Sequence, residues 1–264
     1  MEDYFQVAAL EDVVGSHKNW AHYPARVENN TKTILGLLDK YNVKATCFIV
    51  GWIAEKFPQL VKDIHAAGHS IGCHSYYHRL IYDLTPEEFR QDSKAAKDAL
   101  EQIIGQPVVA YRAPSYSITN KSLWALDILE ELGFIYDSSI FPIYHDRYGI
   151  PDAPRFKYQV PGHNLTEYPI STSIFLGRKI PVAGGGYFRL FPYWFTKMAL
   201  KKINHKDKQP FIFYIHPWEI DPGQPRVHGL SALSKFRHYN NLNKTCGRFE
   251  RLLQDFSFGP MGVE

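Results

Sequence analysis

The sequence is poor in cysteine, with three in 264 residues, and this scarcity excludes two kinds of site. Cys47, Cys73 and Cys246 stand far apart without a Cys-x-x-Cys pair, so they build neither a disulfide framework nor a thiolate zinc knuckle. Lone cysteines usually pack as small buried side chains, and we interpret Cys73 in this way although a histidine follows it. A reducing compartment fits this pattern.

The sequence also lacks a long apolar run and a surplus of one charge. No apolar segment approaches the roughly 18–20 residues that span a bilayer, so we expect no membrane span. The first four residues have neither the basic nor the hydrophobic region of an export signal, and we expect a cytoplasmic protein. The 30 basic and 27 acidic residues give a formal net charge of +3. Because the basic residues are scattered rather than gathered in a patch, a nucleic-acid partner is not expected.

Apolar and β-branched residues gather in short runs that alternate with helical patterns along most of the chain. This alternation is typical of a parallel sheet with crossover helices, so the predicted fold class is α/β. With 45% hydrophobic and 22% charged residues, a chain of 264 residues can bury one sizeable core. The predicted strands are 45–50, 69–74, 108–112, 134–138, 167–172 and 211–216.

Helices are predicted between these strands, and one of them has a complete start signal. Thr85, Pro86 and Glu88 predict an N-cap, a first helical position and a capping box. The other predicted helices are 31–41, 57–67, 119–132, 192–203 and 245–256. A loop rich in proline, glycine and charge is expected over 141–162, as an insertion within a single domain of residues 1–264.

Two histidines follow the predicted strand 69–74, at the strand end where parallel α/β folds gather their chemistry. His74 and His78 stand four residues apart, a spacing that predicts both imidazoles on one side of a helical turn. Two neutral imidazoles can share a metal ion if a third ligand is present. A chance pair is the alternative, because the chain has 12 histidines.

Three further groups could complete a site. The carboxylates of Glu2 and Asp3 would add a hard oxygen ligand to the two histidines, or they form a solvated acidic terminus. Arg112, at the end of strand 108–112, could hold a carboxylate bidentately, or it lies exposed. His216 ends strand 211–216 and could act as a general acid, since its charge changes near neutral pH, or it packs in the core.

In their order along the chain, five motifs resemble those of the polysaccharide deacetylase family, the NodB-homology family that includes carbohydrate esterase family 4. They are Glu2-Asp3, His74-Ser75-x-x-His78, Arg112-Ala113-Pro114, Asp137-Ser138-Ser139 and Ile215-His216. Three longer stretches, 2–7, 181–189 and 216–222, are similar to the exopolysaccharide-locus branch, which is associated with exosortase systems. The resemblance spans nearly the whole chain and implies a branch-specific C-terminal extension from about residue 217.

The resemblance implies a distorted seven-stranded (β/α) barrel that holds a divalent metal, usually Zn²⁺. The ion would be bound by His74, His78 and a carboxylate, for which Glu2 and Asp3 are both candidates. The implied reaction is hydrolysis of an N-acetyl group on a glycan, either a sugar polymer or its precursor in exopolysaccharide biosynthesis. In such a site the metal polarises the amide carbonyl and lowers the pKa of the attacking water.

The resemblance also assigns four roles around the reacting amide. The backbone amide of Ser115 would stabilise the oxyanion. His216 would protonate the departing amine, and Asp137 lies on the motif that positions this histidine. Arg112 would orient the base. Because the family usually has an aromatic residue at position 115, the sugar groove is expected to have a different shape here.

The start of the chain departs from the branch pattern, in which a strand ending in Asp-Val precedes the acidic pair. Met1 stands at the position of the valine, so the first barrel strand and the aspartate base are expected to be missing from this sequence. A start assigned too late, a fragment of a longer gene and a loss of catalysis each explain this departure. If Met1 is the start, Glu2 acts as base and Asp3 as ligand; if residues precede it, Glu2 is the ligand.

Two other functions are compatible with the sequence. A relative without the base could bind carbohydrate without cleaving it. Another amide hydrolase, such as a cyclic-ureide hydrolase, would share the scaffold and similar motifs.

Overall fold

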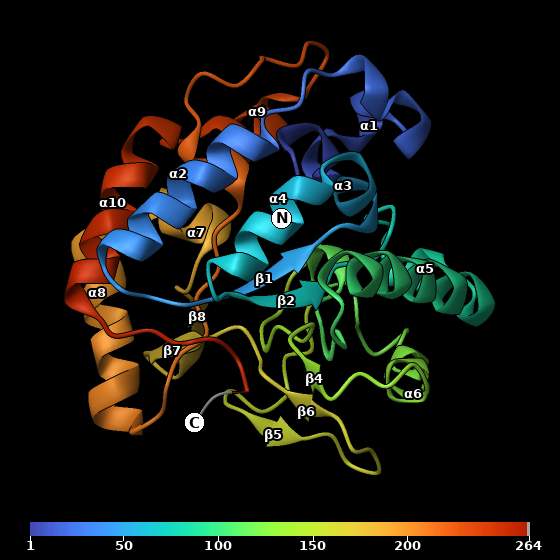
Figure 1. Cartoon of the computed structure of the whole chain (residues 1–264). Helices are drawn as coiled ribbons and strands as arrows, with labels where there is room; N and C mark the ends of the chain where they lie inside the picture. Colours follow the sequence, from blue (N-terminus) through green and yellow to red (C-terminus); the bar gives the residue numbers. More distant parts are fainter. Residues whose placement is uncertain (263–264) are drawn as a thin grey trace.

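A sheet of short, mainly parallel strands forms the centre of the computed structural model, which describes residues 1–262 (Figure 1). The order in the sheet is β1-β2-β3-β4-β6-β5, and only β5 runs antiparallel to its neighbour. The strands are β1 (Thr46–Ile49), β2 (Ser70–Cys73), β3 (Ala110–Tyr111), β4 (Tyr136–Asp137), β5 (Tyr158–Gln159) and β6 (Thr166–Glu167). The predicted α/β class is confirmed.

Helices connect the parallel strands and bury the apolar stripes that the sequence predicted. They are α2 (Val27–Lys40), α3 (Gly51–Lys56), α4 (Pro58–Ala66), α5 (Pro86–Ile104) and α6 (Trp124–Glu131). Thr85 caps α5 as expected, since its Oγ1 accepts from Glu88 N–H at 3.2 Å and Glu88 Oε2 accepts from Thr85 N–H at 2.9 Å. Phe89 and Leu100 of α5 are fully buried in the main core, where α4 and α5 pack against β2.

The second half of the chain adds a hairpin and four helices beside this sheet (Figure 1). These are β7 (Thr172–Phe175), β8 (Arg178–Pro181), α7 (Gly185–Leu190), α8 (Tyr193–Lys202), α9 (Ala232–Tyr239) and α10 (Leu242–Asp255). The short elements are α1 (Glu11–Val14), the π-helix η6 (Ile203–Asp207) and the 3₁₀-helices η1 (Tyr4–Gln6), η2 (Ala8–Leu10), η3 (His17–His22), η4 (Ile81–Asp83), η5 (Pro114–Tyr116) and η7 (Pro217–Ile220). No helix among the described residues combines the length and apolar character that crossing a bilayer requires.

Several predicted boundaries differ from the structure. The predicted strand 167–172 is divided between β6 and β7, and the hairpin β7–β8 was not predicted. Its two-residue turn places Leu176 at φ 48° and Gly177 at φ 76°, and a leucine at positive φ gives no turn signal in the sequence. Helix α2 begins at Val27, four residues before the predicted start, because the apolar pattern does not mark its first turn. The expected loop 141–162 contains β5 near its end.

The predicted strand 211–216 forms only an isolated bridge, in which Tyr214 pairs with Gly184. The two backbones lie so close that a Cβ on Gly184 would sit 2.1 Å from Tyr214 O, and Gly184 has φ 125°. A glycine is therefore required there by both space and conformation.

The described strands do not close into the expected seven-stranded ring, and a groove lies at the opening. Met1 pairs with the outer edge of β1, because its carbonyl accepts from Val50 N–H at 3.3 Å and its ammonium group bonds to the Phe48 carbonyl. No other described strand pairs with this edge. Residues 43–48 and 211–216, mostly apolar, both line a cavity of about 570 Å³. We call the part bounded by these two segments the edge groove.

Candidate metal centre

His74 and His78 lie in the loop that follows β2, and not on a helical turn as their spacing predicted. Ser75 and His78 have φ values of 64° and 53°, which wind the loop tightly enough to bring the two imidazole centroids within 5.0 Å. Asp92 on α5 holds this loop by accepting hydrogen bonds from Ser75 Oγ at 2.6 Å and from Tyr76 N–H at 2.7 Å. The pairing of the histidines was predicted correctly, but its local geometry was not.

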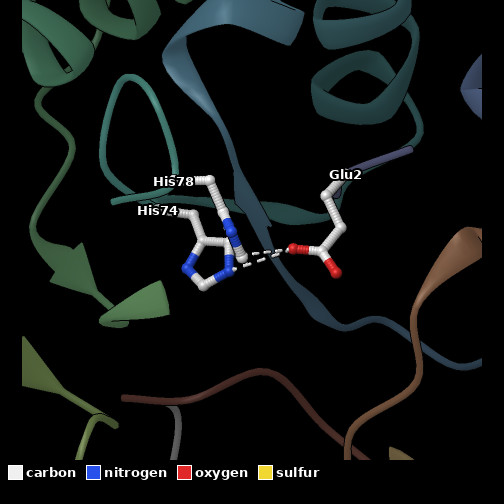
Figure 2. Close-up of side chains that lie close together, drawn as sticks. All are labelled: Glu2, His74 and His78. Atoms are coloured by element: carbon white, nitrogen blue, oxygen red, sulfur yellow. Dashed lines mark ion pairs between the residues drawn. The ribbon is translucent and has the colours of Figure 1, made fainter. Parts of the chain in front are cut away.

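Glu2 is the acid that meets the two histidines (Figure 2). Its Oε2 lies 2.5 Å from His78 Nε2 and 3.7 Å from His74 Nε2, and all three side chains are buried. One ligand atom from each residue lies within 4.8 Å of the others. Two imidazoles and one carboxylate are a donor set for a divalent transition metal, so these residues could hold a metal ion.

The protonation of the cluster suits a cation. His74 Nδ1 lies 2.5 Å from the Arg112 carbonyl, which fixes the proton on Nδ1 and leaves Nε2 free to face Glu2. Burial lowers the pKa of His74 to about 3, so its imidazole is neutral at neutral pH. Burial alone would raise the pKa of Glu2, but the charges of His78 and His216 outweigh it and hold that pKa well below 4.5. Glu2 Oε2 is the carboxylate oxygen that both imidazoles face, so it is the atom available to a metal ion.

Asp3 is not part of this cluster, so its prediction as a metal ligand is wrong. Its carboxylate caps two backbone turns instead: Oδ1 accepts from Tyr4 N–H at 2.9 Å, and Oδ2 accepts from the amides of Arg26 at 2.6 Å and Val27 at 2.9 Å. The side chain is fully buried. The expectation of a solvated acidic terminus is also wrong, because both acids at the start of the chain are buried.

His216 faces the same cavity from the second half of the chain. Its Nε2 lies 3.8 Å from Glu2 Oε1, and its ring is partly exposed. Its Nδ1 lies 2.9 Å from Glu219 Oε2, which also accepts the His216 N–H at 2.9 Å. Glu219 therefore fixes both the backbone and the ring of His216. Asp137, which was expected to help position this histidine, makes no hydrogen bond or ion pair with it among the described residues.

A buried ion pair supports Glu219 from behind. Arg189 Nε donates to Glu219 Oε1 at 2.8 Å, and the two side chains are 2% and 1% exposed. The remaining guanidinium N–H groups donate to the carbonyls of Arg237, His238 and Asn240 at 2.8–3.1 Å. Burial raises the pKa of Glu219, but His216 and Arg189 outweigh it and bring this pKa to about 2. The pair is therefore charged, and the guanidinium makes four hydrogen bonds among the described residues, the kind of partners that a buried ion pair requires.

Arg112 does not hold a carboxylate as predicted. It donates to the Ser138 carbonyl at 3.1 Å and to Ser138 Oγ at 2.7 Å, and its guanidinium lies 4.4 Å from the centre of the Phe48 ring. Arg112 and Ser115 both line the cavity, and Ser115 has φ 50°. Asp137 is fully buried beside Glu167, outside the described cavity lining. Burial raises the pKa of Asp137 to about 6, and burial together with the charge of Asp137 raises that of Glu167 well above 4.5.

Sequence reasoning missed the residues that orient the site. Arg189, Trp218 and Glu219 stood within the branch-similar stretches 181–189 and 216–222 and Glu167 within a predicted strand, but none of them was given a role. The local signal for Glu219 was its place three residues after His216, which matches the spacing of a capping interaction at η7. Arg189 and Glu167 lie 30 residues from their partners Glu219 and Asp137, a separation that carries no local pattern.

Two family profiles match the chain, one in each half. Residues 9–136 match the profile described as polysaccharide deacetylase, and residues 138–263 match a profile described as a domain of unknown function, DUF3473. The boundary falls within β4, whose pairing partner β6 lies in the second matched segment.

Curated relatives match part of the chain. A peptidoglycan-N-acetylglucosamine deacetylase of Bacillus cereus is 37% identical over 98 residues, which are 37% of this chain and 36% of the relative. A peptidoglycan deacetylase of Helicobacter pylori is 29% identical over 120 residues, which are 44% of this chain and 40% of the relative. The chain thus aligns with well under half the length of these relatives.

Solved structures with a similar fold cover most of the chain. A protein from Mycobacterium smegmatis assigned to the polysaccharide deacetylases has a TM-score of 0.52 at 20% identity, over 89% of this chain and 80% of its own. PuuE allantoinase has a TM-score of 0.56 at 15% identity, over 85% of this chain and 65% of its own. At such identities the likeness concerns the fold alone.

Proposed function

Through residues 9–136 the chain belongs to the polysaccharide deacetylase family, and on that premise we propose that it is a metal-dependent hydrolase of N-acetyl groups on a sugar polymer or its precursor. One observation carries this proposal: Glu2, His74 and His78 converge on one point at the wall of a cavity of about 570 Å³. We assign the reaction to exopolysaccharide biosynthesis because of the branch motifs in the sequence. Both matched segments would act as one unit.

The reaction adds water to the amide carbonyl, breaks the C–N bond and releases acetate and a free amine. A divalent ion held by Glu2, His74 and His78, which we propose to be Zn²⁺, would polarise that carbonyl and lower the pKa of a bound water. His216 would hold a proton on Nε2 and deliver it to the departing nitrogen, while Nδ1 stays on Glu219. The Ser115 backbone amide would stabilise the oxyanion, since this residue lines the cavity beside Arg112.

The base that takes a proton from the water is the remaining requirement. Glu2 is the only acidic side chain among the described residues that line the cavity, and it serves as metal ligand. A parallel strand that filled the edge groove beside β1 would end at Met1, next to the metal centre. We propose that an aspartate at the end of such a strand, in a longer form of the chain, acts as base.

The first experiment compares the 264-residue chain with a form extended by the in-frame codons upstream of Met1. Both are loaded with Zn²⁺ and incubated with N-acetylglucosamine oligomers, and acetate release is measured. We expect the extended form to release acetate and a His74→Ala, His78→Ala double variant of it to release none. An extended form that stays silent on every amide-bearing glycan contradicts the proposal.

A second candidate function is carbohydrate binding without hydrolysis, and the single acid in the cavity favours it. Under this alternative, both forms bind glycan oligomers in a calorimetric titration but neither releases acetate. The double histidine variant separates the two functions. If the parent releases no acetate and the variant still binds glycan as the parent does, carbohydrate binding without hydrolysis is supported.

A further inference from the structure

Among the described residues, the region that matches the domain of unknown function makes one hydrogen bond to Glu2, and its His216 lies 3.8 Å from the same carboxylate. Trp218 Nε1–H donates to Glu2 Oε1 at 3.2 Å, across 216 positions of sequence. We propose that Trp218 is a positioning residue for the metal ligand Glu2, and that holding this ligand is a task of residues 138–263. The inference rests on the metal centre of the proposed function and adds the part that aims its carboxylate.

The hydrogen bond divides the two oxygens of Glu2 between two tasks. Oε1 accepts the indole N–H, and Oε2 faces the two imidazoles. Glu2 is 2% exposed, and no other hydrogen bond to Oε1 is found in the described part of the chain. A carboxylate without this anchor could turn about its side-chain torsions. With the anchor in place, Oε2 points toward His74 and His78.

The indole is itself held rigidly, which a positioning residue requires. Its ring stacks between the rings of His216, at 5.5 Å and 15°, and His238, at 4.4 Å and 13°. The Arg189 guanidinium lies over the ring at 5.0 Å. Gln224 locks the arrangement, since its Nε2 donates to the Trp218 carbonyl at 2.8 Å and its Oε1 lies 2.7 Å from His238 Nε2.

All five groups of this assembly come from the second matched segment, whereas both histidine ligands come from the first. Partners that hydrogen-bond to metal ligands fix their orientation, and loss of such a partner commonly lowers metal affinity or activity by about 10- to 100-fold. The second segment therefore acts on metal affinity without supplying a histidine or a carboxylate to the ion.

The test measures Zn²⁺ affinity in metal-stripped protein by competition with a chromophoric chelator, so no catalytic activity is needed. We expect Trp218→Phe to bind Zn²⁺ about 10- to 100-fold more weakly than the parent chain. Trp20→Phe is the matched control, because Trp20 is also a buried indole in the cluster that contains Trp218 but has no hydrogen bond to Glu2 among the described residues. Its affinity should stay within about threefold of the parent.

Replacement of Trp218 by 3-benzothienylalanine provides a second variant in case the phenylalanine disturbs packing. The sulfur analogue keeps the size and stacking of the indole and removes only the N–H, and we expect the same loss of affinity from it. If both variants bind Zn²⁺ as tightly as the parent, the inference is overturned while the metal centre stands. If the parent binds no better than a His78→Ala variant, the metal centre is overturned and the inference with it.

Discussion

Two turns bring histidines to the same cavity, and they are held in different ways. The loop of His74 and His78 is fixed by contacts to its backbone, from Asp92 on α5, and by the Arg112 carbonyl on His74. The turn of His216 is fixed by Glu219, which pairs with Arg189 in the interior at an exposure of 2% or less for both side chains. The first turn therefore depends on hydrogen bonds near the sheet, and the second on a buried charge pair.

This difference separates what each turn contributes to the molecule. Removal of His74 or His78 leaves the buried Glu2 carboxylate with Trp218 and His216 beside it, so their loss should affect the metal more than the fold. Removal of Arg189 leaves the buried Glu219 carboxylate with His216 as its remaining charged neighbour and takes the donor from three backbone carbonyls, so its loss should affect the fold more. The second turn should therefore couple the site to the stability of the protein.

The strongest test of this contrast is Arg189→Met. We expect a loss of about 3–5 kcal/mol in the free energy of unfolding, because the variant removes the guanidinium from the buried Glu219 carboxylate and takes the donor from the carbonyls of Arg237, His238 and Asn240. Urea denaturation monitored by circular dichroism measures it. Lys94→Ala is the control, since the pair of Lys94 with Asp98 on α5 is exposed and should contribute less than about 0.5 kcal/mol. Equal losses in the two variants would remove the distinction between the turns.

A His78→Ala variant tests the first turn. Zn²⁺ affinity should fall by about 100-fold or more, because a direct ligand matters at least as much as the outer partners of a metal site. The midpoint of urea denaturation without metal should fall less than in Arg189→Met, because Glu2 keeps Trp218 and His216 beside its carboxylate. His205→Ala, an exposed histidine in η6, is the control and should leave both measurements unchanged. A large loss of stability in His78→Ala would show that the first turn also supports the fold.

Glu219→Gln examines the orientation of His216 in the extended, active form. We expect kcat for acetate release to fall about 10- to 100-fold with little change in KM, because the amide keeps a partner on His216 Nδ1 but removes the charge that stabilises its protonated ring. Steady-state kinetics on N-acetylglucosamine oligomers measure the two constants. A change confined to KM would assign Glu219 to substrate binding instead.

The same variant has a signature in acid. The pKa of Glu219 lies at about 2 in the folded protein and near 4.5 when unfolded, so its contribution to stability is present above pH 4.5 and is lost as the pH falls toward 2. Glu219→Gln should lack this part of the acid dependence. The free energy of unfolding should therefore fall less between pH 6 and pH 3.5 in the variant than in the parent.

The smallest expected effect concerns the buried carboxyl pair beside β4. Burial raises the pKa of Asp137 to about 6, and burial with the charge of Asp137 raises that of Glu167 well above 4.5. The protonated pair therefore contributes to the stability of the fold at low pH, and this contribution is lost as the pH rises. Glu167→Gln removes one titrating group, and we expect it to flatten this decline between pH 4.5 and 7. The variant should gain about 1 kcal/mol relative to the parent at pH 7, measured by urea denaturation. If the free energy of unfolding declines with pH as steeply in the variant as in the parent, the raised pKa values of this pair are contradicted.

The parts of the fold that the sequence predicted correctly are those with local signals. The capping box at Thr85 and the apolar runs of β1 and β2 lie within a few residues, and each predicted its element. The hairpin β7–β8 escaped because Leu176 adopts positive φ without a residue type that favours it. The predicted strand 211–216 was apolar enough for a strand, but its pairing depends on a distant partner at Gly184.

The candidate site divides in the same way. The histidines His74, His78 and His216 were found because each lies at or just after the end of an apolar run. Glu2 was found because it and Asp3 are neighbouring carboxylates that could add an oxygen ligand. The choice between Glu2 and Asp3 could not be made from sequence, since it depends on the amides of Arg26 and Val27 that occupy Asp3. Orienting residues carry no such signal, because what they do depends on a partner far along the chain.

The edge groove has a consequence for the protein in concentrated solution. A strand edge whose backbone groups face an apolar slot is a template onto which a second molecule can add its own backbone. We expect the 264-residue chain to self-associate as its concentration rises, which light scattering would detect, and the form extended upstream of Met1 to stay monodisperse. A second copy of the chain would then fill the edge groove, which is part of the same cavity as the metal centre. Self-association and access to the metal centre would therefore depend on the same opening beside β1.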